Sequence, residues 1–151
     1  MSTTQLETAL AQIVGRANVL FQRPRFDLDA LPCAAPGSVD EVSALLKLAT
    51  RDTLRVVPLG LGSKLGWCNA PERVDFLLTT RRLVGAVSHE PADGTIAVRA
   101  GESIAELAAR VERGGHRFTP DVPHPANSTI GGVVAAGQSG FDRLRFGPVQ
   151  H

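Results

Sequence analysis

The sequence lacks an excess of charge of either sign, a long apolar run and a set of cysteines. Its 151 residues carry 16 Lys and Arg against 15 Asp and Glu, a net charge of +1, which provides no basic face of the kind that binds duplex nucleic acid. No apolar run approaches the roughly 18–20 residues of a membrane span. Cys33 and Cys68 form neither a disulfide framework nor a metal knuckle.

Other absences narrow the class of protein further. His89, His116, His124 and His151 do not have the spacing of metal ligands, so no metal site is predicted. Residues 1–16 carry polar side chains inside their apolar stretch and do not form a signal peptide. No Ser–His–Asp arrangement or pair of acids indicates hydrolysis. With 43% hydrophobic residues the chain can bury a core, and we expect a soluble, cytoplasmic protein.

The first half of the chain alternates helical and strand patterns. Apolar residues three and four apart predict a helix over residues 3–20, capped by Thr3 or Thr4. Residues 22–37 are interpreted as irregular, with a short extended piece over 33–35. Ser38 and Glu41 form a capping box that begins the next helix, which ends near residue 51. Its predicted apolar stripe consists of Val39, Val42, Leu45, Leu46 and Ala49.

Two apolar runs, 54–58 and 75–79, predict short strands on either side of a glycine-rich loop over 59–71. A strand, a helix and a strand in close succession predict a small parallel α/β layer over residues 33–80. After residue 80 the pattern changes: the runs 83–89 and 95–100 flank an Asp-Gly turn and predict an antiparallel hairpin.

A second capping box, Ser103 with Glu106, opens a helix that ends at Gly114. A proline-containing loop over 116–127 follows, and residues 128–137 are expected to begin another helix. We therefore predict an α+β fold in three parts. These are an N-terminal helix and extended segment over 1–35, a first subdomain over 36–80, and a second subdomain over 81–151.

The first of two glycine clusters, residues 58–66, directly follows a predicted strand. Glycines there can adopt positive φ and let backbone N–H groups converge on an anion, to which Ser63 adds a hydroxyl and Lys64 a charge. A phosphate or pyrophosphate group is the expected ligand of this loop. Neither the dinucleotide fingerprint nor the P-loop fits, because Gly66 comes one residue late and Ser63 stands where a P-loop has glycine. A mobile surface turn remains the alternative. Cys68 has no neighbour that argues for a lowered pKa beyond Lys64, so we take it as inert.

The second cluster is Thr129-Ile130-Gly131-Gly132. A Thr cap followed by paired glycines at a helix N-terminus would place free N–H groups and a favourable dipole against an anion. The small residues that follow would allow a ligand or a neighbouring backbone to approach closely. The alternative is a tightly packed helix of small residues.

Together these motifs resemble the FAD-binding domain of the vanillyl-alcohol oxidase / p-cresol methylhydroxylase (PCMH-type) flavoprotein family. Within it, Gly62-Ser63-Lys64 and the run from Ala135 to Gly140, with Arg143 after it, are most similar to the FAD-binding E subunits of bacterial glycolate oxidases. The six ordered matches span residues 36–147: Pro36-Gly37-Ser38, Val57-Pro58, Gly60-Leu61-Gly62-Ser63, Val98-Arg99-Ala100-Gly101, Pro120-Asp121 and Thr129-Ile130-Gly131-Gly132.

The resemblance implies an FAD site. The backbone of residues 59–63 would wrap the pyrophosphate, the second cluster would approach the pyrophosphate or the flavin edge, and small residues after it would pack beside the ring or ribityl chain. FAD is expected to be non-covalent, since Ser63 stands where some members carry a linking His. The implied cofactor-binding residues are Pro58, Leu59, Gly60, Leu61, Gly62, Ser63, Lys64, Asp121, His124, Thr129, Ile130, Gly131, Gly132, Ala136 and Gly137.

The resemblance also implies a function, an FAD-binding module of an oxidoreductase acting on a 2-hydroxy acid such as glycolate, with other subunits of a multi-subunit oxidase as partners. No catalytic acid or base can be named. Family members continue with further strands and a substrate-binding cap domain, so we expect the second subdomain to be incomplete and the isolated chain to be inactive. Two alternatives stay open: a non-catalytic assembly module with the flavin fold, or a same-fold oxidoreductase with another substrate, such as the cell-wall sugar-nucleotide reductases.

Overall fold

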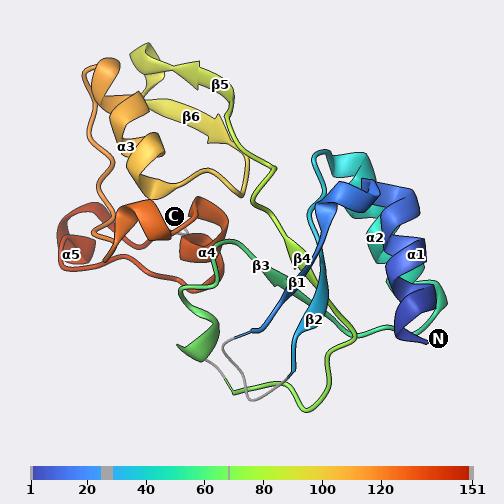
Figure 1. Cartoon of the computed structure of the whole chain (residues 1–151). Coiled ribbons are helices and arrows are strands. Elements are labelled where there is room, and N and C mark those ends of the chain that lie inside the picture. Colours follow the sequence, from blue (N-terminus) through green and yellow to red (C-terminus); the bar gives the residue numbers. More distant parts are fainter. Residues whose placement is uncertain (1, 25–28, 68, 150–151) are drawn as a thin grey trace. The chain divides into compact units, whose positions relative to one another are not determined.

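The computed structural model describes residues 2–24, 29–67 and 69–149 (Figure 1). The chain divides into two compact units, Met1–Arg82 and Leu83–His151. Within the described residues, no helix has both the length and the apolar character needed to cross a membrane. The fold mixes helices and sheet, as predicted.

The first unit is built on a four-stranded sheet. Its strands are β1 (Val19–Gln22), β2 (Leu31–Ala34), β3 (Val56–Leu59) and β4 (Phe76–Thr79), in the order β1-β2-β4-β3. β2 and β3 both pair in parallel with β4, which confirms the predicted parallel layer, and β1 adds to β2 in the antiparallel sense.

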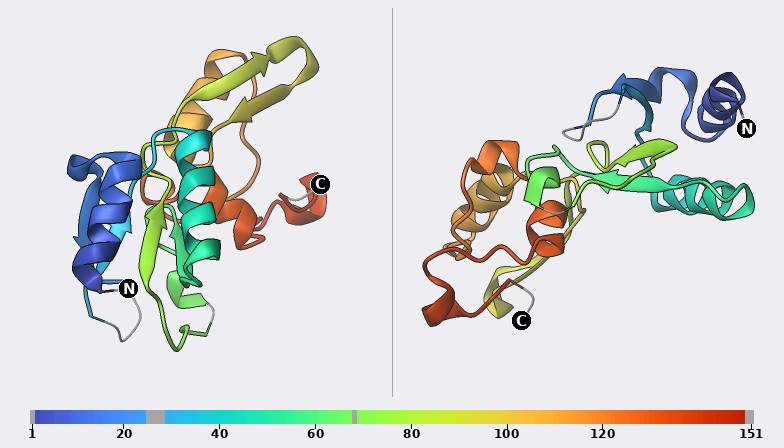
Figure 2. Two further views of the ribbon diagram at one scale, coloured as in Figure 1. Left: turned by 90° about the vertical axis from the view of Figure 1, so that its right-hand side faces the viewer. Right: turned by 90° about the horizontal axis from the view of Figure 1, so that it is seen from below.

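Two helices, α1 (Thr3–Val14) and α2 (Val39–Arg51), cover one face of this sheet (Figure 2). Side chains alternate along the strands, so Ala34, Phe76 and Leu78 face the helices while Cys33 and Leu77 face the other side. The opposite face is covered by a smaller cluster that includes residues of the loops.

The predicted apolar stripe of α2 is rotated in the structure. Leu45, Leu48 and Ala49 enter the core, as three residues on one helical face. Val39 and Leu46, which the sequence placed in the stripe, are 70% and 49% exposed. Periodicity alone did not distinguish the buried apolar face from an adjoining exposed one.

The predicted helix over 3–20 is too long at its C-terminal end. α1 ends at Val14, because Gly15 adopts a φ of +83° and Asn18 Nδ2 donates a 2.7 Å hydrogen bond to Val14 O. A 3₁₀ turn over Arg16–Asn18 then leads into β1, a strand the sequence analysis missed. The N-cap is Ser2 rather than Thr3 or Thr4.

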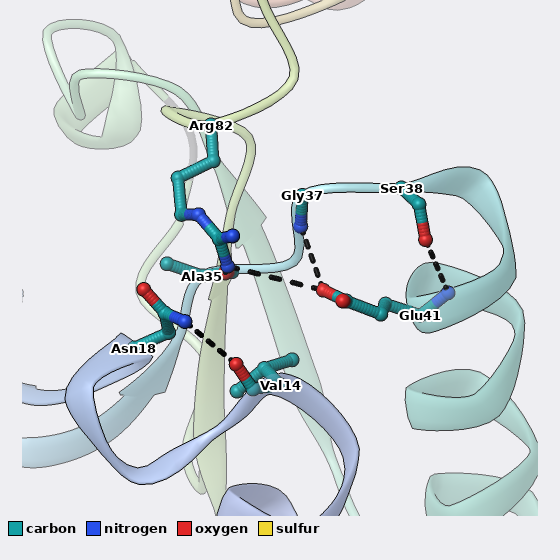
Figure 3. A network of polar contacts seen from close by, with 7 residues as sticks. All are labelled: Val14, Asn18, Ala35, Gly37, Ser38, Glu41 and Arg82. Atoms are coloured by element: carbon teal, nitrogen blue, oxygen red, sulfur yellow. Dashed lines mark hydrogen bonds and ion pairs between the residues drawn. The ribbon is translucent and has the colours of Figure 1, made fainter.

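The start of α2 is tied to the end of β2 and to the last residue of the unit (Figure 3). Ser38 Oγ accepts from Glu41 N, as the capping box predicts, but the Glu41 carboxylate accepts from Gly37 N at 2.7 Å. Arg82 Nη1 lies 3.9 Å from that carboxylate and donates to Ala35 O at 2.7 Å. The network fixes the point where the chain leaves the first unit.

The second unit begins with the predicted hairpin, β5 (Ala86–Glu90) paired antiparallel with β6 (Thr95–Val98). The helices α3 (Ile104–Arg113), α4 (Ile130–Ala135) and α5 (Arg143–Phe146) follow. α5 was not predicted. Ile104, Val122 and Val133 form the core of this unit.

Candidate functional site

The loop after β3 begins at the carboxyl ends of two adjacent parallel strands, the position where open α/β sheets commonly bind ligands. Leu59 is buried and its carbonyl accepts from Thr80 N at 2.9 Å, just beyond β4. Thr79 Oγ1 donates to Gly60 O at 3.3 Å. The end of β4 therefore holds the first residues of the loop in place.

Three consecutive amides of this loop have no acceptor among the described residues. They belong to Leu61, Gly62 and Ser63. Gly62 has a φ of +76°, a left-handed conformation that glycine adopts without strain. Successive N–H groups around such a residue form a concave cradle for an anion. Gly62 therefore has the positive φ that the prediction for the first glycine cluster requires, and the anion site itself stays a prediction.

Lys64 adds a cation to this cradle. Its Nζ donates to Ser63 Oγ at 3.3 Å and lies 5.9 Å from the centroid of the Trp67 ring. Partial burial lowers the pKa of Lys64, because desolvation disfavours the charged form. An anion placed beside Nζ would offset that penalty. Pro58 is exposed next to the loop, and Cys68 lies outside the described residues.

The second cluster differs from its expectation. Ile130 N donates to Glu102 O at 2.9 Å, Gly131 N to Ala100 O at 3.0 Å, and Gly132 N to the Thr129 hydroxyl at 3.2 Å. The expectation that these amides are free for an anion is therefore wrong. The helix that follows is also only six residues long, so its dipole is small.

The two glycines of this cluster have different packing requirements. A Cβ at Gly131 would lie 2.8 Å from Ala100 O and 2.9 Å from Ala100 Cβ, closer than non-bonded atoms approach. A Cβ at Gly132 would meet only Thr129 Oγ1, at 3.2 Å. Gly131 is needed for backbone packing, whereas Gly132 is the better candidate for close approach of a ligand.

The remaining predicted residues lie in the same unit as the second cluster. Asp121 N donates to Ser139 O at 3.2 Å, and the Asp121 side chain is exposed. His124 is exposed with a φ of +52°, a strained conformation for a non-glycine residue. Ala136 and Gly137 end α4 and are exposed. The structure thus divides the predicted residues into two groups, one in each unit.

Sequence reasoning missed three residues that support these groups. Thr79 holds the first loop, as described above. Glu102 is buried and pairs with Arg110 of α3, whose Nη2 lies 3.3 Å from Glu102 Oε1. The only signal for Glu102 in the sequence was its position immediately before the Ser103 cap. An acidic residue there is explained by favourable charge near a helix N-terminus, so it did not indicate a buried ion pair. No cluster of three His, Cys, Asp or Glu side chains that could hold a metal occurs in the part of the chain that the structure describes.

The loop after β3 and the glycine segment before α4 both lie within residues 31–151, the part of the chain that a known domain family matches. The model of the family described as "FAD binding domain" matches residues 31–151, and the chain belongs to this family.

Among individual proteins, the chain is 30% identical over 112 residues to D-2-hydroxyglutarate–pyruvate transhydrogenase of Saccharomyces cerevisiae, covering 74% of this chain and 23% of that protein. It is 27% identical to D-2-hydroxyglutarate dehydrogenase of Xanthomonas citri pv. viticola, covering 82% and 26%. It is 26% identical to glycolate oxidase subunit GlcD of Bacillus subtilis, covering 75% and 24%. The aligned region is therefore about a quarter of the length of these relatives.

Solved structures show the same fold. Alkyldihydroxyacetonephosphate synthase superposes with a TM-score of 0.70 at 25% identity, over 80% of this chain and 25% of that chain. p-Cresol methylhydroxylase with substrate bound superposes with a TM-score of 0.74 at 12% identity, over 89% and 29%. The predicted PCMH-type fold is confirmed.

Proposed function

We propose that this chain is the FAD-binding module of a flavin-dependent oxidoreductase that acts on a 2-hydroxy acid such as glycolate. The observation that carries the proposal is the set of amides at Leu61, Gly62 and Ser63 that have no acceptor in the described part of the chain, beside the Lys64 cation. FAD carries a diphosphate, and convergent amides with a nearby cation suit a diphosphate.

In this proposal each unit has a separate task. The loop of residues 58–64 binds the diphosphate through its backbone and Lys64. In the second unit, Gly132, Ala136 and Gly137 offer small surfaces to the ring or ribityl chain, with Asp121 and His124 on a neighbouring loop. Bound FAD supplies the redox chemistry, and the protein supplies binding, orientation and polarity. Ser63 gives the loop no imidazole for a covalent link, so FAD is held non-covalently.

The substrate class is supported by the names of the relatives. D-2-hydroxyglutarate and glycolate are both 2-hydroxy acids, and they occur in the names of three similar proteins. Because the chain matches only about a quarter of each, we propose that additional polypeptide provides the substrate site. The subunit designation of the Bacillus subtilis protein favours partner subunits as its source.

A second candidate function is a non-catalytic assembly module. Phe141 and Leu144, which lie close together in the chain, are 94% and 101% exposed. Large exposed apolar side chains gathered in one segment are typical of a protein-binding surface. In this alternative the chain binds a partner subunit and holds no flavin.

A titration of the purified chain with FAD distinguishes the two functions. We expect quenching of flavin fluorescence on binding and release of intact FAD on denaturation, since the link is non-covalent. Gly62→Ala should weaken binding, because alanine is strained at a φ of +76°. Gly66→Ala is the matched control, as no atom lies within 4 Å of a Cβ built there. A folded chain that binds no FAD but forms a stable complex with a partner subunit would favour the assembly function.

A further inference from the structure

The backbone of residues 99–104 is the template on which the second glycine cluster is built. On one side it pairs with residues 128–131. Ile104 N donates to Ser128 O at 2.9 Å, and Ser103 forms a β-bridge with Thr129. The hydrogen bonds from Ile130 N and Gly131 N, described above, complete this pairing. On the other side it is bonded to residues 83–85, where Gly101 N donates to Leu83 O at 2.8 Å. The position of the glycine cluster therefore depends on this template.

Glu102 lies in the middle of the template and contacts residues from three other segments, at Gly85, Arg110 and Ile130. Its carboxylate accepts from Gly85 N and pairs with Arg110, while its carbonyl accepts from Ile130 N. The Glu102 side chain is 6% exposed. A buried carboxylate is strongly unfavourable unless it is paired and hydrogen-bonded, so this arrangement holds the side chain in one position.

Arg110 also depends on the Glu102 carboxylate, which further restricts where that side chain can lie. Its Nε is buried and has no hydrogen-bond partner among the described residues, and the ion pair of Nη2 with Glu102 offsets part of the cost of burying that atom. Loss of the carboxylate would leave both the Arg110 charge and Gly85 N without their acceptor. An unpaired Arg110 charge or an unpaired Gly85 N–H would each displace residues 99–104. The segment that begins α4 would move with them.

We propose that Glu102 is a positioning residue of the flavin site. Through its carboxylate contacts with Gly85 and Arg110 it fixes the backbone that holds Ile130 and Gly131, and so sets where Gly132 stands relative to the cofactor. The effect of Glu102 on the cofactor rests on the proposed FAD-binding function. Its effect on the backbone at Ile130 and Gly131 is independent of FAD.

The structural part is tested by amide hydrogen exchange, followed by NMR, at Ile130 and Gly131 in the chain without FAD. In Glu102→Gln the side chain keeps its shape and one acceptor but loses its charge. We expect exchange at both amides to accelerate relative to global unfolding, by roughly 5- to 150-fold, the range expected when a buried group loses its partner. Val122→Ala is the control, since it weakens the core that contains Ile104 and Val133 but removes none of the hydrogen bonds of the template. Equal acceleration in both variants would mean that Glu102 only adds global stability, and would overturn the proposal.

The functional part is tested by FAD affinity at a temperature where all variants are folded. Glu102→Gln should bind FAD more weakly than a Val122→Ala chain of equal unfolding temperature. If Glu102→Gln does not fold, Arg110→Gln provides a milder break in the same pair, because the Arg110 side chain is 32% exposed. The Arg110→Gln chain should show the same exchange pattern. Unchanged FAD affinity in a variant with fast exchange at Ile130 would overturn the positioning role. A wild-type chain that binds no FAD would refute the proposed function, while the exchange data would still decide the role of Glu102.

Discussion

Asp75 and Arg55 are joined twice in the first unit. Arg55 N donates to Asp75 Oδ2 at 2.7 Å, and Asp75 N donates to Arg55 O at 2.8 Å. The guanidinium of Arg73 lies 2.9 Å from the other carboxylate oxygen. These contacts precede β3 and β4, so they set the register of the two strands whose ends carry the amide cradle.

The first prediction concerns the acid stability of this unit. Burial of the Asp75 carboxyl favours its neutral form, but the hydrogen bond from Arg55 N and the Arg73 guanidinium outweigh burial and hold the pKa of Asp75 below its usual value. The ionised carboxylate therefore stabilises the fold above the unfolded-chain pKa of about 3.9. This contribution is lost as the pH falls through the lower pKa of the folded state.

Asp75→Asn should lower the free energy of unfolding by about 1–3 kcal/mol at pH 6, the range for a hydrogen bond to a charged group. The difference from wild type should narrow as the pH falls below about 4. Denaturant unfolding of both proteins between pH 6 and pH 3 measures this difference in the free energy of unfolding. Asp52→Asn is the control, since the Arg51–Asp52 pair has an exposed arginine and should matter less. A difference that stays constant with pH would contradict the assignment to the ionised carboxylate.

The second prediction separates the two glycines before α4. Gly131→Ala should destabilise the second unit by about 1–3 kcal/mol, because the added methyl group overlaps Ala100 and forces a backbone shift. Gly132→Ala should change stability by no more than about 1 kcal/mol, since alanine favours the helix while Thr129 Oγ1 is only slightly crowded. Urea unfolding of both variants measures the difference. Equal destabilisation would show that the two positions are packed alike.

The sequence predicted the elements whose signals are local. The capping residues Ser38 and Ser103 and the hairpin over β5 and β6 lie where they were expected, because a cap or a turn is determined by residues a few positions apart. The helix over 3–20 was wrong because apolar spacing continued past Gly15, whose positive φ ends α1. β1 was missed because it is specified by pairing with β2 rather than by its own four residues.

The candidate site shows the same division. The positive φ of Gly62 and the amides of Leu61–Ser63, which have no acceptor among the described residues, were predictable, because a glycine-rich turn after a strand leaves its own amides unpaired. The bonding of Ile130 and Gly131 was not, because their acceptors, Glu102 and Ala100, are far away in the sequence. Thr129-Ile130-Gly131-Gly132 has the pattern of an anion site, and only tertiary structure shows that these amides are already used.

The third prediction concerns the thiol of Cys33. The side chain is 1% exposed on β2, and burial raises the pKa of this thiol above its usual value, although Arg81 and the backbone of Thr79 act in the opposite direction. Because the thiolate is the reactive form, Cys33 should resist alkylation until the unit unfolds. Maleimide labelling with mass spectrometry of the Cys33 peptide measures this, with a urea-unfolded sample as the control. Rapid labelling in native buffer would show that β2 opens readily.

The last prediction is that the charge of Lys64 lowers the stability of the FAD-free chain while it increases FAD affinity. Desolvation lowers the pKa of Lys64, so its charged form is disfavoured in the folded state at pH 7. The penalty disappears as the pH rises through the lowered pKa toward the unfolded value of about 10.4. The stability of Lys64→Met relative to the wild-type FAD-free chain should therefore be higher at pH 7 than at pH 10, while the loss of the contacts with Ser63 and Trp67 acts against it.

The same variant should bind FAD about tenfold more weakly, which corresponds to about 1.4 kcal/mol, because it loses the charge beside the diphosphate. Lys47→Met is the matched control, since Lys47 is exposed on α2 and should affect neither property. Fluorescence titrations and thermal unfolding of the three proteins measure both effects. If Lys64→Met keeps wild-type affinity for FAD, the cation does not lie beside the diphosphate, and the amides of Leu61, Gly62 and Ser63 bind the diphosphate without it. A stability difference between Lys64→Met and wild type that is the same at pH 7 and pH 10 would contradict the desolvation of Lys64 itself.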